Sequence, residues 1–216
     1  MNKKYDFAVF PGDFNPFHYG HIDVLEKASQ YVNKILLFVI DTSPERIASI
    51  PPPVLDINSR YNLVQRYISE GYLGDVEAQY ELYSGNEQFP EFYLHQKCAL
   101  ICGTDVFNYN HFRPDEPQYR EFGWLIENNN NGIILVERPG HPPDDTILSN
   151  VKTKGIDVDI LKGECQVGAR EIRKNIAAGK TITGMVPARL ENDIFKMYLT
   201  HIPGGLRSKP VLTSQK

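Results

Sequence analysis

The stretch Phe10-Pro-Gly-Asp-Phe-Asn-Pro-Phe-His-Tyr-Gly-His21 decides how this chain folds. It begins where a short apolar run, residues 7–10, predicts a strand, and it passes through a Gly/Pro turn into a segment with helical periodicity. His18 and His21 are three residues apart at the mouth of that helix, so both rings can face one side. The free N–H groups and the dipole of a helix N-terminus attract phosphate. The stretch therefore predicts a strand–turn–helix unit with a phosphate site where the helix begins.

Strand-like and helix-like stretches alternate along the rest of the chain. Strands are predicted at residues 7–10, 35–40, 76–82, 99–102, 133–136 and 156–161, and helices at 21–32, 58–70, 118–127, 169–177 and 188–199. Such alternation implies right-handed βαβ crossovers, so we predict an α/β fold: a doubly wound, mainly parallel, Rossmann-like sheet with helices on both faces. Sheets of this kind bind ligands at the carboxyl ends of their strands, near the point where the strand order reverses.

Length, composition and charge set the outer limits of the function. The 216 residues, 41% apolar and 23% charged, are typical of a globular chain. We expect one domain over residues 1–202, with a C-terminal helical part at about 169–200, and a flexible tail at 203–216. No apolar run is long enough to span a bilayer and no secretory signal is visible, so we expect a cytoplasmic protein that binds no membrane. The net charge of −4 also disfavours a nucleic-acid partner, although it leaves room for a small anion in a local pocket.

The histidine stretch also carries a family resemblance. Gly12-Asp-Phe-Asn-Pro-Phe-His-Tyr-Gly-His21 resembles the GxFxPxHxGH signature of the HxGH-motif nucleotidyltransferase superfamily. Four later pieces narrow the resemblance to nicotinate or nicotinamide mononucleotide adenylyltransferases. They are Arg60 in a helix, a strand ending in G-x-D at residues 100–105, a strand ending in RPG at 134–140, and a helix start at 167–173 similar to ISSTxIR. The resemblance spans Tyr5 to about Leu199, and the order and spacing of the pieces carry it.

The resemblance implies an adenylyl transfer. A phosphate of the acceptor mononucleotide would attack the α-phosphorus of ATP, and pyrophosphate would leave. The partners are then ATP and a mononucleotide, with Mg²⁺ bound through the ATP phosphates and no protein ligand for the metal. A homo-oligomer is possible, because nothing in the sequence sets the oligomeric state.

The resemblance also assigns roles to individual residues. His18 and His21 would act on the ATP phosphates, and Arg173 would hold the β- or γ-phosphate through its planar fork of donors. Nucleotide-binding positions are Gly12, Asp13, Phe14, Gly20, Gly103, Asp105 and Arg170, and substrate-binding positions are Arg46, Phe112 and Trp124. Among these, Asp105 could accept hydrogen bonds from ribose hydroxyls.

Several positions depart from the family pattern. Asp13 stands where the family carries Ser or Thr, and a carboxylate there would repel phosphate unless a cation or a hydrogen bond intervenes. Gly168, Ala169 and Arg170 replace the hydroxyls of the late motif, and Arg170 could compensate for them. Two alternatives therefore stay open. One is another transferase of the superfamily, such as a phosphopantetheine adenylyltransferase or a cytidylyltransferase, and the other is a diverged, non-catalytic nucleotide-binding module.

Overall fold

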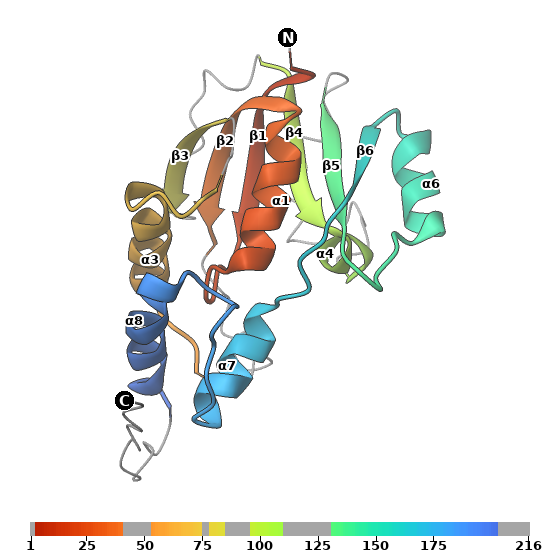
Figure 1. Cartoon of the computed structure of the whole chain (residues 1–216). Coiled ribbons are helices and arrows are strands. Elements are labelled where there is room, and N and C mark those ends of the chain that lie inside the picture. Colours follow the sequence, from red (N-terminus) through yellow and green to blue (C-terminus); the bar gives the residue numbers. More distant parts are fainter. Residues whose placement is uncertain (1–2, 41–52, 75–77, 85–95, 110–130, 203–216) are drawn as a thin grey trace.

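A parallel sheet forms the middle layer of the molecule (Figure 1). The computed structural model describes residues 3–40, 53–74, 78–84, 96–109 and 131–202. Within these residues, six strands are hydrogen-bonded in the order β3-β2-β1-β4-β5-β6, and every neighbouring pair is parallel. The strands are β1 (Tyr5–Gly12), β2 (Val32–Val39), β3 (Gln79–Ser84), β4 (Cys98–Gly103), β5 (Gly132–Glu137) and β6 (Asp157–Lys162). The predicted doubly wound α/β fold is confirmed, and the strand order reverses between β1 and β4.

Both faces of the sheet are buried. Along β1, Phe7 and Val9 join one apolar cluster while Ala8 and Phe10 join another, because successive side chains of a strand point to opposite faces. The helices that cover the sheet and extend it are α1 (Tyr19–Ser29), α3 (Ile57–Ser69), α4 (Thr104–Tyr109), α6 (Asp145–Thr153), α7 (Ala169–Ala177) and α8 (Ala188–Leu199). Figure 1 shows α1 lying across the face of the sheet that is turned toward the viewer.

The two C-terminal helices lie beyond the carboxyl ends of the strands and are anchored in the main core. Ile172 and Ile176 of α7 and Ile194 of α8 are fully buried in the same apolar cluster as β1 and α1. In Figure 1, α8 runs beside α3, and Arg66 of α3 forms an ion pair of 3.1 Å with Asp193 of α8. The chain from β6 to α7 therefore passes directly under the end of the sheet where a ligand is expected.

Most elements lie where the sequence predicts them. Helices α7 and α8 have the predicted bounds, and α3 differs by one residue at each end. The helix predicted at 21–32 is wrong at both ends. It begins at Tyr19 because His18 caps it, and it ends at Ser29 because Val32 is needed to pair with Tyr5 as the first residue of β2. The strand predicted at 76–82 begins only at Gln79, which pairs with Lys34 of β2.

Two short helices were not predicted. One is α4, directly after β4, and the other is α6, whose first N–H groups bond the side chain of Asp144. The Asp144 cap just after two prolines is a start signal that could have revealed α6. The helix predicted at 118–127 and the tail at 203–216 lie outside the described residues. Among the residues that are described, no helix is long and apolar enough to cross a membrane.

Candidate active site

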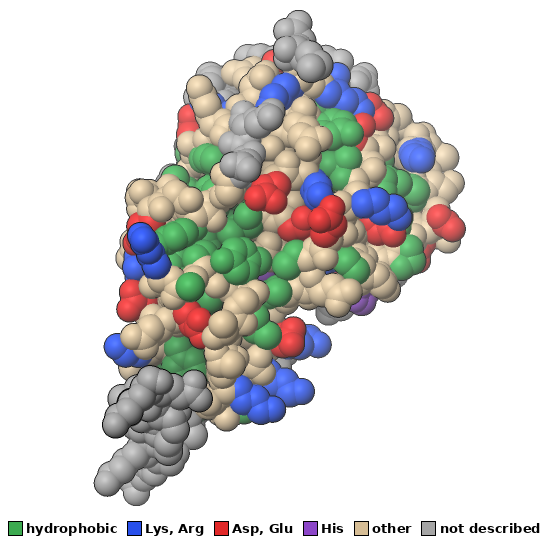
Figure 2. All heavy atoms as spheres, viewed as in Figure 1, with side chains coloured by type: hydrophobic (Ala, Val, Ile, Leu, Met, Phe, Trp, Pro, Cys, Tyr) green, Lys and Arg blue, Asp and Glu red, His purple; other side chains and the backbone are tan. Residues whose placement is uncertain are grey.

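The candidate site lies where β1 and β4 end side by side. Gly12 is the last residue of β1 and Gly103 the last residue of β4, and these two strands flank the reversal of strand order. In an open parallel sheet this is the place where the crevice for a ligand forms. Figure 2 shows the surface hollowed between the sheet and α7, with Lys and Arg side chains gathered beside α7.

The first turn of α1 is capped by the two histidines. Nδ1 of His18 accepts a hydrogen bond of 3.0 Å from the N–H of Gly20, and Nδ1 of His21 accepts one of 3.3 Å from the N–H of His18. This is a capping box in which imidazoles replace the usual hydroxyl and carboxylate. Because both Nδ1 atoms are acceptors, each neutral ring carries its proton on Nε2. The cap therefore leaves one N–H donor on each ring for a ligand.

Both imidazoles are held in their neutral form. Their rings stack with centroids 3.8 Å apart, and His21 also packs against Phe14 and Phe17 at 5.1 and 5.0 Å. Burial among these rings is the largest cause that lowers the pKa of His18 well below its usual range and the pKa of His21 to about 3. The positive charge of Arg138 lowers both values further. At neutral pH the pair is thus a set of two uncharged donors, which suits hydrogen bonding to phosphate oxygens.

Two buried arginines hold the loop between β1 and α1 from beneath. Arg60, only 1% exposed, donates from Nη1 to the carbonyl oxygen of Asp13 at 2.6 Å. Arg173, 6% exposed, donates from Nη1 to the carbonyl oxygen of Asn15. These carbonyls therefore bond inward to guanidinium groups from α3 and α7. Arg173 therefore lies against the loop with this donor directed at a backbone carbonyl, and its role toward the ATP phosphates stays a prediction.

Two buried tyrosines complete the support of the loop. Tyr67 of α3 donates to the carbonyl oxygen of Phe17 at 2.9 Å, and Tyr198 of α8 donates to Oδ1 of Asn15 at 2.5 Å. Burial raises the pKa of both phenols above the usual range, so both remain protonated donors. Sequence reasoning missed these residues, since a tyrosine on the buried face of a helix gives no signal beyond core packing.

Gly12 and Gly20 are required by close approaches within the protein. A Cβ atom on Gly12 would lie 2.6 Å from the ring of Phe14, whose backbone has a φ of 43°. A Cβ atom on Gly20 would lie 2.4 Å from the carbonyl oxygen of Val167. Phe14 was predicted to bind the nucleotide, and with 2% of its surface exposed it is buried against Phe10 and Phe17.

An ion pair crosses the end of β4. Asp105, in the first turn of α4, accepts from Nη1 of Arg138 at 2.7 Å, and Nη2 of Arg138 donates to the carbonyl oxygen of Val167 at 3.0 Å. The backbone N–H of Arg138 bonds the hydroxyl of Thr104 at 3.0 Å. Arg138 is the arginine of the RPG motif, to which the sequence reasoning gave no role. Its position at a strand end was the signal that could have identified it.

The remaining predicted site residues are placed less centrally or not at all. Arg170 is exposed on the first turn of α7, whose N-cap residue Gly168 forms no side-chain cap. Arg46, Phe112 and Trp124 lie outside the described residues, so their roles stay predictions.

No cluster of three or more His, Cys, Asp or Glu side chains with metal-binding geometry occurs in the parts of the chain that the structure describes.

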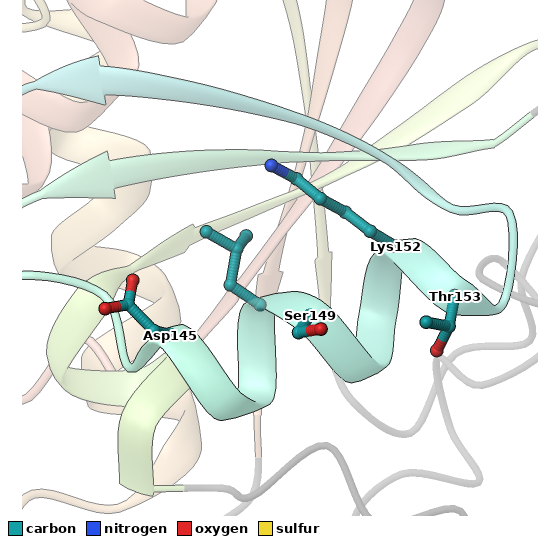
Figure 3. A pocket seen from close by; sticks show the side chains of 5 residues that line it. Asp145, Ser149, Lys152 and Thr153 are labelled. Atoms are coloured by element: carbon teal, nitrogen blue, oxygen red, sulfur yellow. The ribbon is translucent and has the colours of Figure 1, made fainter.

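An open hollow of about 400 Å³ runs along α6, lined by Asp145, Leu148, Ser149, Lys152 and Thr153 (Figure 3). Its lining residues come from α6 alone, and none of them contributes to the strand-end site.

Comparison with known proteins agrees with this geometry. The model of the family described as cytidylyltransferase-like matches residues 9–167. A relative from Clostridium tetani, named "Probable nicotinate-nucleotide adenylyltransferase", is 23% identical over 214 residues, covering 91% of this chain and 98% of the relative. One of the same name from Pseudothermotoga lettingae is 25% identical over 209 residues, covering 92% and 99%. A phosphopantetheine adenylyltransferase from Gloeobacter violaceus is 26% identical over 72 residues, covering 33% of this chain and 40% of the relative.

Proposed function

Because the chain belongs to the cytidylyltransferase-like family, we propose that it transfers AMP from ATP to nicotinate or nicotinamide mononucleotide and releases pyrophosphate. The observation that carries the proposal is the pair of neutral histidines at the N-terminus of α1, each with a proton on Nε2. The two full-length relatives support the choice of mononucleotide as acceptor.

The arrangement suits a reaction that needs positioning more than a protein nucleophile. The acceptor phosphate is already an anion, so it would attack the α-phosphorus of ATP directly. The Nε2–H groups of His18 and His21 would hydrogen-bond the phosphate oxygens as negative charge builds up on them. Fixed donors in a water-poor site stabilise such charge without having to reorient.

Mg²⁺ would be carried by the ATP phosphates, where it supplies positive charge against the triphosphate. The carboxylate of Asp13, in the loop after β1, has the oxygen chemistry that this ion prefers. A single carboxylate fits an ion that is held chiefly by the nucleotide and by water.

A panel of acceptors tests the proposal. Pyrophosphate release from ATP is measured with nicotinate mononucleotide, nicotinamide mononucleotide, phosphopantetheine and no acceptor. We expect release to depend on a mononucleotide. Release with phosphopantetheine alone would replace the proposal with the second candidate, which the match to the Gloeobacter relative favours. No release with any acceptor would indicate a nucleotide-binding module.

A second prediction concerns the carboxylate of Asp13. The charge of Asp13 acts to raise the pKa of Arg173, against the larger effect of burial, so this carboxylate lies within electrostatic reach of the buried guanidinium. We expect Asp13→Ser to reduce turnover by up to about a hundredfold, equivalent to ~1–3 kcal/mol, and to change the Mg²⁺ dependence. Mg²⁺ titrations of both proteins, with Asp13→Asn as the variant of matched size, measure the effect. Identical metal curves with higher activity in Asp13→Ser would mean that Asp13 only repels phosphate.

A further inference from the structure

Of the described arginines near the strand ends, Arg138 lies beside the histidine cap, because it bonds the carbonyl oxygen of Val167, which lies 2.4 Å from where a Cβ atom on Gly20 would stand. Arg173 lies beneath the loop and bonds the Asn15 carbonyl, and Arg170 projects from the exposed side of α7. The side chain of Arg138 is 23% exposed, so it is accessible and still partly shielded from water. Its positive charge lowers the pKa of both His18 and His21, which places it within electrostatic reach of both rings.

The guanidinium of Arg138 has two partners: the Val167 carbonyl, which orients it, and the Asp105 carboxylate, which forms an ion pair with it. Nη2 donates to the carbonyl oxygen of Val167, in the segment that leads into α7. Nη1 pairs with the carboxylate of Asp105, which is 41% exposed. An exposed ion pair of this kind is weak, so a ligand with more charge can displace the carboxylate.

Gly103 makes room for this pair. A Cβ atom on Gly103 would lie 2.7 Å from Oδ1 of Asp105 and 3.6 Å from Cδ of Arg138. A side chain at the end of β4 would therefore crowd the Asp105 carboxylate, while the distance to Arg138 is an ordinary contact. The ion pair thus packs directly over the last residue of β4.

We propose that Arg138 binds the pyrophosphate portion of ATP, and that the Asp105 carboxylate occupies this guanidinium until phosphate oxygens displace it. Arginine suits this exchange because its planar fork can bond two phosphate oxygens as well as it bonds one carboxylate. The bond from Nη2 to Val167 keeps the side chain aimed at the site while Nη1 changes partner. Asp105 is released as the nucleotide arrives, and its carboxylate becomes free to accept from the ribose hydroxyls. The proposal rests on the proposed function only in taking ATP as the nucleotide.

Calorimetric titration with inorganic pyrophosphate, ATP and AMP tests the exchange. Arg138→Gln removes the charge and the guanidinium fork and keeps a polar side chain. It should weaken binding of pyrophosphate and ATP by about 10- to 100-fold, while AMP, which lacks the pyrophosphate portion, changes less than about threefold. Arg66→Ala, which removes another ion-paired arginine on the outer side of α3, is the matched control and should bind like the wild type.

A double-mutant cycle distinguishes exchange from a general effect of charge. Asp105→Asn removes the competing carboxylate, so it should tighten pyrophosphate binding about three- to tenfold in the wild-type background. In the Arg138→Gln background that gain should vanish. A gain that persists there would overturn the exchange, and wild-type affinity in Arg138→Gln would overturn the assignment of Arg138. If Arg138→Gln melts early, Arg138→Lys, which keeps the charge without the fork, should show an intermediate loss.

These titrations do not depend on turnover. A wild-type protein that releases no pyrophosphate with any acceptor, but whose ATP affinity depends on Arg138, would contradict the proposed function and leave this inference standing. If the wild type turns over a mononucleotide but its pyrophosphate affinity does not depend on Arg138, the proposed function stands and this inference is wrong.

Discussion

Replacing His21 by alanine should lower turnover by about 10²–10³-fold, the cost of losing one aligned donor in an active site. The Nδ1 atom accepts from the His18 backbone N–H, so the ring carries its proton on Nε2, the donor that we propose for a phosphate oxygen. Loss of the ring should therefore act mainly on the rate, with a minor loss of α1 capping. Pyrophosphate release at saturating ATP measures the rate, and thermal unfolding checks the fold. His201→Ala, at an exposed position just after α8, is the control.

The same assignment predicts how turnover depends on pH. The pKa of His21 is lowered to about 3 and that of His18 also lies well below its usual range, so both rings are neutral at the pH where an ordinary histidine titrates. Protonation of these rings should therefore cause no loss of rate near pH 6.5, where an ordinary histidine titrates. Near-normal turnover in His21→Ala, or a wild-type rate that falls with a midpoint near 6.5, would contradict the role given to the pair.

Replacing Arg173 by alanine should reduce ATP use strongly and also destabilise the fold. The side chain is 6% exposed and donates to the carbonyl of Asn15, so alanine leaves a buried acceptor without this donor and a cavity beneath the loop. Leaving a buried carbonyl unsatisfied costs about 1–3 kcal/mol, and the cavity adds to this cost. Arg173→Lys should recover only part of the activity, because an ammonium lacks the planar fork. Pyrophosphate release against ATP concentration and denaturant unfolding measure the two effects.

Lys174→Ala is the matched control, since it removes an exposed cation from the next position of α7. It should leave ATP use and stability near those of the wild type. If Arg173→Ala used ATP as well as the wild type, the role would pass to Arg170, the other arginine of that helix start.

The sequence alone led to the sheet, to the strand ends as the site, and to the two histidines. Those signals are local: alternation of apolar residues, a Gly/Pro turn, and a three-residue spacing at a helix start. They could not predict that α1 stops at Ser29, because that boundary is set by pairing between Val32 and Tyr5.

The sequence by itself therefore determined the sheet, most of its helices and the loop that carries the histidine pair. Only the tertiary structure decided what supports that loop and how Arg138 is oriented. Arg173 reaches the Asn15 carbonyl across 158 positions of the chain, and Arg138 reaches Asp105 across 33. Neither contact has a sequence pattern, because each exists only when packed strands and helices bring the two segments together. A hydrogen bond depends on distance and direction between atoms, and the order of residues along the chain constrains neither at such separations.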